Sequence, residues 1–364
     1  MKRILITGIL PLLLAALLLL PAFANSVYDV DDSGEIDIND VTVLLNALAG
    51  SSEGKDVDGN GTVDINDVTV LLDALSAGVQ IPPSEGLAFT LNDDGESYSV
   101  TGMGECSDTV LVIPETYNGK PVTKIGEWAF SGCADLTSVT IPDSVTSIGE
   151  AAFYDCPSLE IVTIGNGVAT MDDGAICYCE SLTSVTIPDS VTSIGEEMFN
   201  GCSNLEHLFV ASGNTKYHSS GNCIIETESK TLIAGCKNSV IPTDGSVTSI
   251  GQTAFYDCAG LTSIVFPESV TKISAWSFEK TGLTNVIIPG NIEVIEWFSF
   301  SYCSSLSSVT LPLSVCKIED GAFRGCTSLD TIYYAGSAEQ WSQISIDGDN
   351  DPLKNATIVY NYEG

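Results

Sequence analysis

A 23-residue repeat constrains the fold of this chain more than any other feature of its sequence. The repeats fall into two blocks, with steps of 23 residues and one step of 22, and they start at Ile125, Ile148, Met171, Ile194, Ile250, Ile273, Ile295 and Ile318. A fixed period of this length predicts a solenoid, in which each repeat forms one coil and packs against its neighbours.

The pattern inside one repeat indicates what each coil contains. Residues 125–147 read Ile-Gly-x-x-Ala-Phe-x-x-Cys-x-x-Leu-x-x-Val-x-Ile-Pro-x-x-Val-x-x. Leu136, Val139 and Ile141 have the spacing of a leucine-rich strand, and Pro142 ends the strand because proline cannot donate to a ladder. We expect these strands to stack in parallel. The phenylalanines at position 6 should fill the space behind them: Phe130, Phe153, Phe199, Phe255, Phe278, Phe300 and Phe323.

The cysteines follow the same repeat. Twelve cysteines in a secreted chain would ordinarily indicate disulfides. Seven of them share position 9 of the repeat: Cys133, Cys156, Cys179, Cys202, Cys258, Cys303 and Cys326. Coils about 4.8 Å apart leave disulfides between neighbours possible. A column in which each cysteine faces two equivalent neighbours favours buried thiols instead. Cys223 and Cys236 could also form a pair.

The repeats resemble the BspA-type leucine-rich repeats of bacterial surface and secreted proteins over residues 87–362. The resemblance implies an α/β-type leucine-rich repeat solenoid with a parallel β-sheet. It also implies a hairpin insertion near residues 211–245, carried by Gly213 to Ala234, and a C-terminal cap at residues 335–364, carried by Trp341 to Tyr360. It implies ligand binding and supplies no general catalytic residues.

A second pattern is a twelve-residue acidic loop that occurs twice near the N-terminus, at residues 29–40 and 56–67. Calcium takes six to eight oxygens, and alternating side-chain oxygens around a central glycine suit it, with the position 7 residue offering its backbone carbonyl. We therefore expect two calcium ions. The predicted ligands are Asp29, Asp31, Ser33, Glu35, Asp37, Asp40, Asp56, Asp58, Asn60, Thr62, Asp64 and Asp67.

Each acidic loop is followed by an apolar helix pattern. Val41, Leu44, Leu45 and Leu48 fall at i, i+3, i+4 and i+7, and Val68, Leu71, Leu72 and Leu75 repeat this spacing. Neither loop has room for an entering helix, and position 12 is Asp where an ordinary EF-hand has Glu.

In these respects residues 27–78 resemble a type I dockerin. The resemblance implies a small all-α domain of paired loop-helix units that docks onto a cohesin module of a scaffold protein, as in cellulosomes. The implied contacts are Ile38, Asn39, Leu45, Asn46, Ile65, Asn66, Leu72 and Asp73. Because the Ile-Asn pairs are identical in the two halves, docking in two orientations is expected. A calcium-stabilised helix pair without a partner is the alternative.

The N-terminus predicts export. Lys2 and Arg3 precede an apolar run from Ile4 to Leu20 and a small-x-small site at residues 22–24, so residues 1–24 read as a secretory signal peptide. A retained membrane anchor is the alternative, but the run is rather short for a span. The predicted domains are then a dockerin at residues 25–78, a linker at 79–86 and a solenoid at 87–364. The net charge of -35 disfavours nucleic acid and anionic membranes as partners.

The outward positions of the predicted strands give a candidate ligand face. They begin with Ser138, Thr140, Ser184 and Thr186 and continue with His207, Phe209, Val265, Ile287 and Tyr333. Exposed apolar residues in a row mark a binding surface. The Ser and Thr positions are equally explained by the preference of such residues for strands.

Catalysis finds little support in the sequence. The chain has only His207 and His218, neither in a nucleophile elbow or a zinc motif, and Ser219 and Ser220 beside His218 are expected to be polar turn residues. The prediction is a secreted, scaffold- or cell-surface-associated binding protein without catalytic activity, with a protein or glycan ligand. The alternatives are a glycoside hydrolase-type enzyme of polysaccharide catabolism in the same assembly and an adhesin.

Overall fold

The computed structural model describes residues 82–363. The expected signal peptide, both acidic loops, their helices and the residues expected to contact a cohesin lie outside the described residues. The chain divides into two compact units, Met1–Pro82 and Pro83–Gly364, and the predicted linker spans this boundary. The fold can therefore be followed within the second unit.

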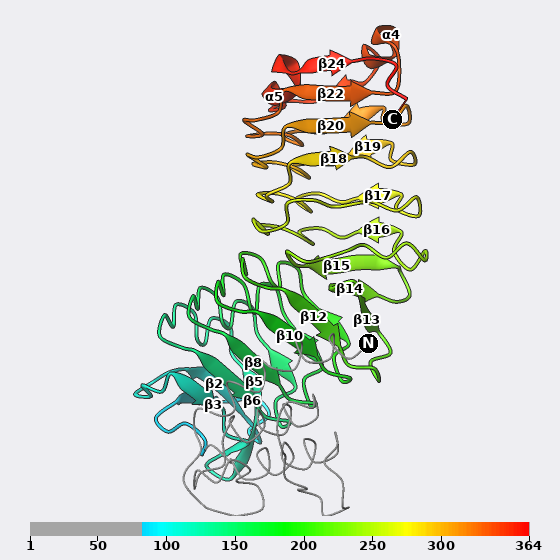
Figure 1. The fold of residues 1–364 in the computed structure, drawn as a ribbon. Coiled ribbons are helices and arrows are strands. Elements are labelled where there is room, and N and C mark those ends of the chain that lie inside the picture. The colour runs from blue at the N-terminus through cyan, green and yellow to red at the C-terminus, as the bar shows by residue number, and fades with distance from the viewer. Residues whose placement is uncertain (1–81, 364) are drawn as a thin grey trace, which may run out of the picture. The chain divides into compact units, whose positions relative to one another are not determined.

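Nearly every coil of the second unit contributes one long strand to a parallel arrangement (Figure 1). Before residue 211 these strands are β3 (Val110–Val112), β6 (Ser138–Ile141), β8 (Ile161–Ile164), β10 (Ser184–Ile187) and β12 (His207–Val210). After residue 245 they are β18 (Asn285–Ile287), β20 (Ser308–Leu311), β22 (Thr331–Tyr334) and β24 (Thr357–Val359). Strands of successive repeats pair in register, as Ser138 does with Ile161, which confirms the predicted parallel stacking.

A short strand at the start of each repeat forms a second parallel face. These strands are β7 (Ser147–Ile148), β9 (Thr170–Met171), β11 (Ser193–Ile194), β16 (Ser249–Ile250), β17 (Lys272–Ile273), β19 (Val294–Ile295), β21 (Lys317–Ile318) and β23 (Ser345–Ile346). At the N-terminal end, β1 (Ala88–Leu91) pairs antiparallel with β2 (Tyr98–Gly102), and β2 pairs with β5 (Lys120–Ile125). The short β4 (Thr116–Tyr117) also pairs with β5.

The segments between short and long strands are turns, which corrects the expectation of an α/β-type solenoid. Positions 4 and 8 of every repeat have positive φ: Trp128, Ala151, Gly174, Glu197, Thr253, Trp276, Phe298 and Gly321 at position 4, and Gly132, Asp155, Tyr178, Gly201, Asp257, Lys280, Tyr302 and Gly325 at position 8. A right-handed helix cannot pass through such residues. In the described residues the α-helices are α4 (Ala338–Trp341) and α5 (Asp351–Asn355), both in the C-terminal cap, so the fold there is a β-solenoid.

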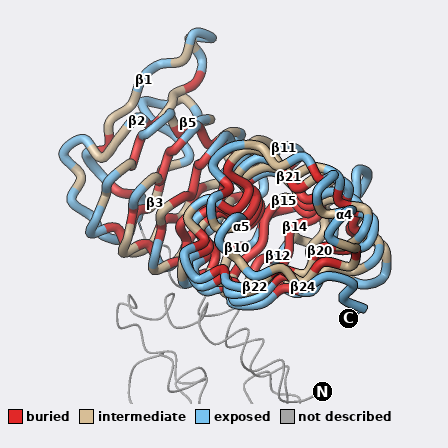
Figure 2. The backbone as a smooth tube through the Cα atoms, turned by 90° about the horizontal axis from the view of Figure 1, so that it is seen from above, coloured by how far each residue is buried: buried red, intermediate tan, exposed pale blue. Residues whose placement is uncertain are grey.

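The core runs through the centre of the coils, where buried residues line the inside of the tube (Figure 2). Its most regular component is the predicted phenylalanine row, in which rings of successive coils stack with centroids 5.3 Å apart for Phe130 and Phe153 and 5.4 Å apart for Phe278 and Phe300. Offset stacking of this kind adds to the burial energy of each ring. Ile176 takes the ring's place in one coil.

All twelve cysteines are free thiols, and most are buried. The position 9 thiols donate to the carbonyl of position 6 in the preceding repeat, as Cys156 Sγ does to Phe130 O at 3.2 Å and Cys326 Sγ to Phe300 O at 3.1 Å. Cys179, Cys202 and Cys303 make the same bond. Because a buried carbonyl without a partner is costly, the thiol column satisfies a backbone group in coil after coil.

An antiparallel hairpin interrupts the stack between the two blocks of repeats. It consists of β13 (Tyr217–Ser220), β14 (Cys223–Glu226) and β15 (Thr231–Gly235), and β15 then pairs in parallel with β16. Strand β14 is buried on both faces, with Ile224 in the core of the first block and Ile225 in the core of the second. The hairpin therefore separates two cores, and the coils on its two sides stack along different directions (Figure 1).

Candidate ligand-binding face

Four of the five residues that the sequence indicated as a ligand face lie on the long strands, and the fifth lies in an equivalent segment. His207 and Phe209 lie on β12, Ile287 on β18 and Tyr333 on β22, while Val265 lies in the corresponding segment of the coil before β18. Val265 is 78% exposed, Ile287 66% and Phe209 40%. These are large apolar side chains that the fold leaves in solvent.

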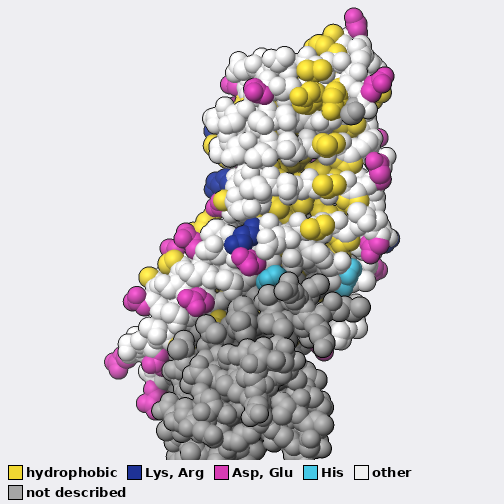
Figure 3. Space-filling view, viewed as in Figure 1, with side chains coloured by type: hydrophobic (Ala, Val, Ile, Leu, Met, Phe, Trp, Pro, Cys, Tyr) yellow, Lys and Arg dark blue, Asp and Glu magenta, His cyan; other side chains and the backbone are white. Residues whose placement is uncertain are grey.

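Strand register places part of this set in one line across the sheet, with Thr310 between Ile287 and Tyr333. Ile287 pairs with Thr310, Thr310 with Tyr333, and Tyr333 with Val359. Hydrophobic side chains accordingly form a column over β18 to β24 (Figure 3). Sequence reasoning missed Val359, because it lies in the cap, beyond the last full repeat, where the periodicity no longer assigns an outward position.

Tyr333 is half-buried because the cap covers it. The rings of Tyr333 and Tyr362 lie 4.6 Å apart between centroids at an angle of 41°. Tyr362 is itself exposed, so the two rings offer a joint aromatic surface at the end of the row. We call the set Val265, Ile287, Tyr333, Val359 and Tyr362 the apolar row.

The hairpin divides the predicted face into two groups. Within residues 82–363, β12 pairs with β10 and β18 pairs with β20, and no ladder connects β12 with the coil of Val265. On the near side of the hairpin, His207 and Phe209 stack with centroids 5.9 Å apart. The structure therefore brings Val265, Ile287 and Tyr333 onto one side of the hairpin and places His207 with Phe209 on the other.

The first block presents a polar face. Thr140 lies beside Thr163 on β6 and β8, and Thr186 lies beside Phe209 on β10 and β12. These outward threonines alternate with buried valines and isoleucines, as expected for one face of a solvated sheet. The apolar character begins only at Phe209.

The two histidines have structural partners. His207 Nδ1 lies 3.4 Å from Asn222 Oδ1, and His218 Nδ1 lies 2.9 Å from Thr227 Oγ1. Ser219 lies in β13 rather than in a turn, and its hydroxyl accepts a hydrogen bond from the Val210 amide at 3.0 Å. His218 and Ser219 are neighbours on one strand, so their side chains point to opposite faces and cannot form a nucleophile-base pair.

Metal and membrane features are absent from the part of the chain that the structure describes. There, no cluster of three or more His, Cys, Asp or Glu side chains has the arrangement of a metal site. The helices described are also too short to cross a bilayer.

The family model for the BspA type leucine rich repeat region matches six copies, over residues 105–223 and 229–349. This chain belongs to the BspA-type leucine-rich repeat family. No curated protein matches it. The hairpin of the BspA-type array falls at the break between the two matched stretches.

Solved structures with the same kind of repeat include three relatives. A leucine rich cell surface protein from Faecalibacterium prausnitzii is 23% identical, with 72% of this chain and 97% of that chain covered and a TM-score of 0.45. A leucine rich repeat protein from T. pallidum is 25% identical over 68% and 90%, with a TM-score of 0.39. One from Bacteroides capillosus is 32% identical over 37% and 98%, with a TM-score of 0.32.

Proposed function

We propose that this protein is a secreted, non-catalytic binding protein whose long-strand face holds a protein or glycan ligand. The observation that carries the proposal is the apolar row, in which Val265 and Ile287 are 78% and 66% exposed beside otherwise polar outward positions. A solvated sheet does not need aliphatic side chains at such positions. Contiguous exposed apolar surface is characteristic of interaction sites.

The composition of the row also suits binding. Aromatic anchors surrounded by aliphatic contacts supply most of the energy of typical interfaces. Tyr333 with Tyr362 forms such an anchor at one end, and Phe209 with His207 forms another across the hairpin. Burying apolar area contributes about 25 cal/mol per Å², so a partner covering both groups gains a large share of its affinity from them.

We further propose that the N-terminal region acts as a calcium-dependent dockerin and attaches the solenoid to a cohesin-bearing scaffold. This rests on the sequence alone: two twelve-residue loops with calcium-ligand spacing and identical Ile-Asn pairs in both halves. The carboxylate and amide oxygens of these loops are the donors that calcium takes. The signal-like residues 1–24 support export of the whole assembly.

The two calcium loops are expected to differ in affinity. Ser33 stands in the first loop where the second has Asn60, and a serine hydroxyl is the poorer ligand. A calorimetric titration of the calcium-free chain should therefore resolve two steps. Replacing Ser33 with Asn should make the calcium affinities of the two loops more nearly equal, so that the two binding steps merge. Equal affinities in the unmodified chain would contradict the assignment of Ser33 as the weaker ligand.

The experiment that tests the whole proposal is capture of partners from the native secretome with and without a calcium chelator. Partners of the dockerin-like region should no longer be captured when chelator removes calcium. Partners of the solenoid should still be captured. Incubation of the purified chain with plant polysaccharides supplies the control for catalysis. Release of reducing sugar in proportion to enzyme concentration would overturn the non-catalytic proposal.

A further inference from the structure

A groove opens where the hairpin separates the coil that starts at Ile194 from the coil that starts at Ile250. Its volume is about 350 Å³. Tyr178, Tyr256 and Trp276 line it with aromatic surface, and Glu197, Gln252 and Glu279 line it with polar groups. All six belong to the turn segments between short and long strands, so the groove is separate from the apolar row.

The groove exists because the turn ladder is interrupted at this point. In the first block, position 4 donates its amide to a backbone carbonyl of the next coil, as Trp128 does to Glu150 and Gly174 to Glu196. Glu197 has no such neighbour 23 residues on, because the hairpin occupies that stretch. Its amide donates instead to the hydroxyl of Thr253, 56 residues away, at 3.2 Å. A side chain takes part in each of the two hydrogen bonds between the coils here, Glu197 N to Thr253 Oγ1 and Gln252 Nε2 to Glu196 Oε2, which leaves room between them.

The aromatic walls of the groove are held in place from behind. A Cβ at Gly201 would come within 2.5 Å of the Tyr178 ring, so glycine there lets this ring lie against the backbone. Trp276 stacks on Phe298 with centroids 6.0 Å apart and an interplanar angle of 4°. Lys280 donates to the Tyr256 hydroxyl at 3.0 Å. A ligand would therefore meet rings whose positions are already fixed, which lowers the cost of ordering them.

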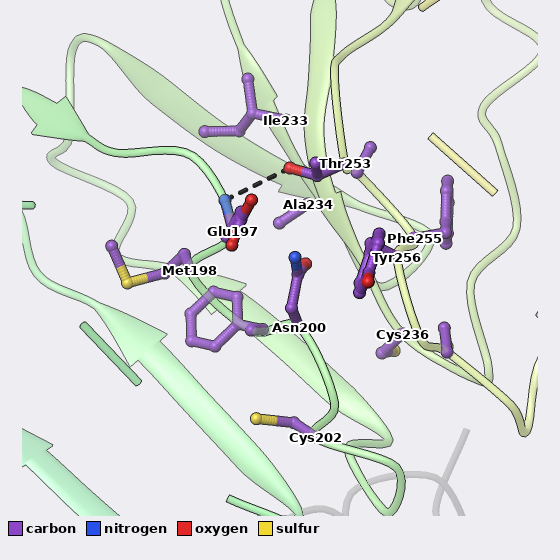
Figure 4. A pocket seen from close by; sticks show the side chains of 14 residues that line it. Glu197, Met198, Asn200, Cys202, Ile233, Ala234, Cys236, Thr253, Phe255 and Tyr256 are labelled. Carbon is purple, nitrogen blue, oxygen red and sulfur yellow. Dashed lines mark hydrogen bonds between the residues drawn. The ribbon is translucent and has the colours of Figure 1, made fainter. Parts of the chain in front are cut away.

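A buried hydrogen-bond donor lies beside this groove, in the lining of an adjoining cavity. A smaller cavity of about 10 Å³ shares Glu197, Thr253 and Tyr256 with the groove and reaches Asn200. Asn200 is 4% exposed, and its Nδ2 has no hydrogen-bond partner anywhere in residues 82–363. Figure 4 shows the Asn200 amide directed into the space between Glu197, Ala234 and Tyr256. This volume accepts one water-sized group.

The groups around the groove specify the kind of ligand. An unpartnered donor at Asn200 calls for an acceptor, and the carboxylates of Glu197 and Glu279 call for donors. A hydroxyl group serves as both. Flat aromatic faces bind the apolar side of a rigid ring. An ammonium or guanidinium ligand has no acceptor for Asn200, while an anion would meet the two carboxylates.

We propose that this groove binds a neutral saccharide, with a sugar ring on Trp276 and a hydroxyl group that accepts from Asn200 Nδ2. The site lies on the turn side of the solenoid and does not depend on the apolar row. The protein would therefore carry two independent binding sites.

The test is calorimetric titration of the full chain with three neutral hexasaccharides, built of β-1,4-linked glucose, xylose or mannose. At least one should bind with a saturable isotherm. Trp276→Ala should weaken that binding about tenfold or more, as expected for loss of one stacked ring. Trp297→Ala is the matched control, because this tryptophan is 51% exposed on the neighbouring coil and does not line the groove.

Two further variants distinguish binding in the groove from binding elsewhere on the chain. Asn200→Leu keeps the side-chain volume and removes the donor, so affinity should fall while thermal unfolding shows the chain still folded. Phe209→Ser with Tyr333→Ser should leave saccharide affinity unchanged. The proposal is overturned if no hexasaccharide binds, if hexalysine binds in their place, if Trp276→Ala and Trp297→Ala have equal effects, or if Asn200→Leu retains full affinity.

Discussion

At the residue scale, the solenoid repeats one unusual backbone feature rather than one amino acid. Positions 4 and 8 of each coil are left-handed whether the residue is glycine or not. For a non-glycine residue this conformation costs roughly 1 kcal/mol, because Cβ approaches the following carbonyl oxygen. The regular stacking of backbone bonds between coils holds these residues in place. Strain is therefore distributed along the whole array.

Neighbouring alanines in one turn test this strain. Ala151 is left-handed at φ 51°, and Ala152 beside it is not among the positive-φ residues. Ala151→Gly should raise the free energy of unfolding by about 1 kcal/mol because it relieves the strain. Ala152→Gly should lower it by at least a similar amount, since glycine there adds flexibility in the unfolded chain and removes a methyl group from the buried core. Chemical denaturation measures both. Changes of the same sign in the two variants would contradict the strain argument.

The residue scale is also where sequence reasoning reached its limit. Glycines at Gly132, Gly174, Gly201, Gly321 and Gly325 hint at left-handed turns. Tryptophan, lysine or threonine at the equivalent places in other coils conceals them, because neighbouring coils impose the conformation that the residue itself disfavours. The groove site was missed for a related reason. Tyr178, Asn200 and Trp276 come from three different coils and share no sequence pattern.

At the element scale, the hairpin acts as a partition between two hydrophobic cores. The resemblance to BspA-type repeats implied a hairpin in this region, where the repeat breaks between Ile194 and Ile250. The sequence did not predict that β14 would be buried on both faces, because Cys-Ile-Ile is equally consistent with a strand buried on one face only. The consequence for the binding face is that the long strands are divided at β12.

Two adjacent residues of β14 should contribute independently to stability. Ile224 and Ile225 are both fully buried, the first in one core and the second in the other. Ile224→Ala and Ile225→Ala should each lower the free energy of unfolding by about 2–4 kcal/mol. The double variant should show the sum within about 0.5 kcal/mol, because the two side chains share no core contacts. A clear departure from additivity would show that the two cores are coupled through the strand.

At the scale of the whole molecule, the buried thiols link stability to pH. Burial raises the pKa of Cys223 and Cys258 to about 12 and that of Cys303 to about 11, from an ordinary value of 9.0. Above pH 9 the unfolded chain loses these protons while the folded chain keeps them. Folding then binds protons, so stability must fall as the pH rises from 9 toward 12.

This linkage predicts a measurable slope. Each fully buried thiol should subtract up to about 1.4 kcal/mol of unfolding free energy per pH unit in that window. Denaturation at several pH values between 8 and 11, under reducing conditions, measures the total slope. Cys258→Ala should make the slope shallower, because the contribution of the Cys258 thiol to the pH dependence of the unfolding free energy is removed. A slope that this variant leaves unchanged would contradict the linkage at Cys258.

The sequence predicted the large-scale organisation of the described unit well. The 23-residue period predicted the coils, and the outward strand positions predicted that Val265, Ile287 and Phe209 are exposed. The hairpin was implied by the resemblance to BspA-type repeats. The errors of the sequence-based prediction concern the turn segments, where no helix forms, and the continuity of the ligand face. Both depend on contacts between coils, which a single repeat does not encode.

Binding of a partner to the long-strand face can be tested by comparing three forms of the chain. The full chain, its Phe209→Ser/Tyr333→Ser variant and a Trp128→Ser/Trp297→Ser control are used to capture partners from the native secretome in chelator. The control removes two aromatic side chains that are each 51% exposed on the turn side. We expect the full chain and the control to capture the partner and the Phe209→Ser/Tyr333→Ser variant to lose it, with circular dichroism showing all three folded. Equal capture by all three would contradict it.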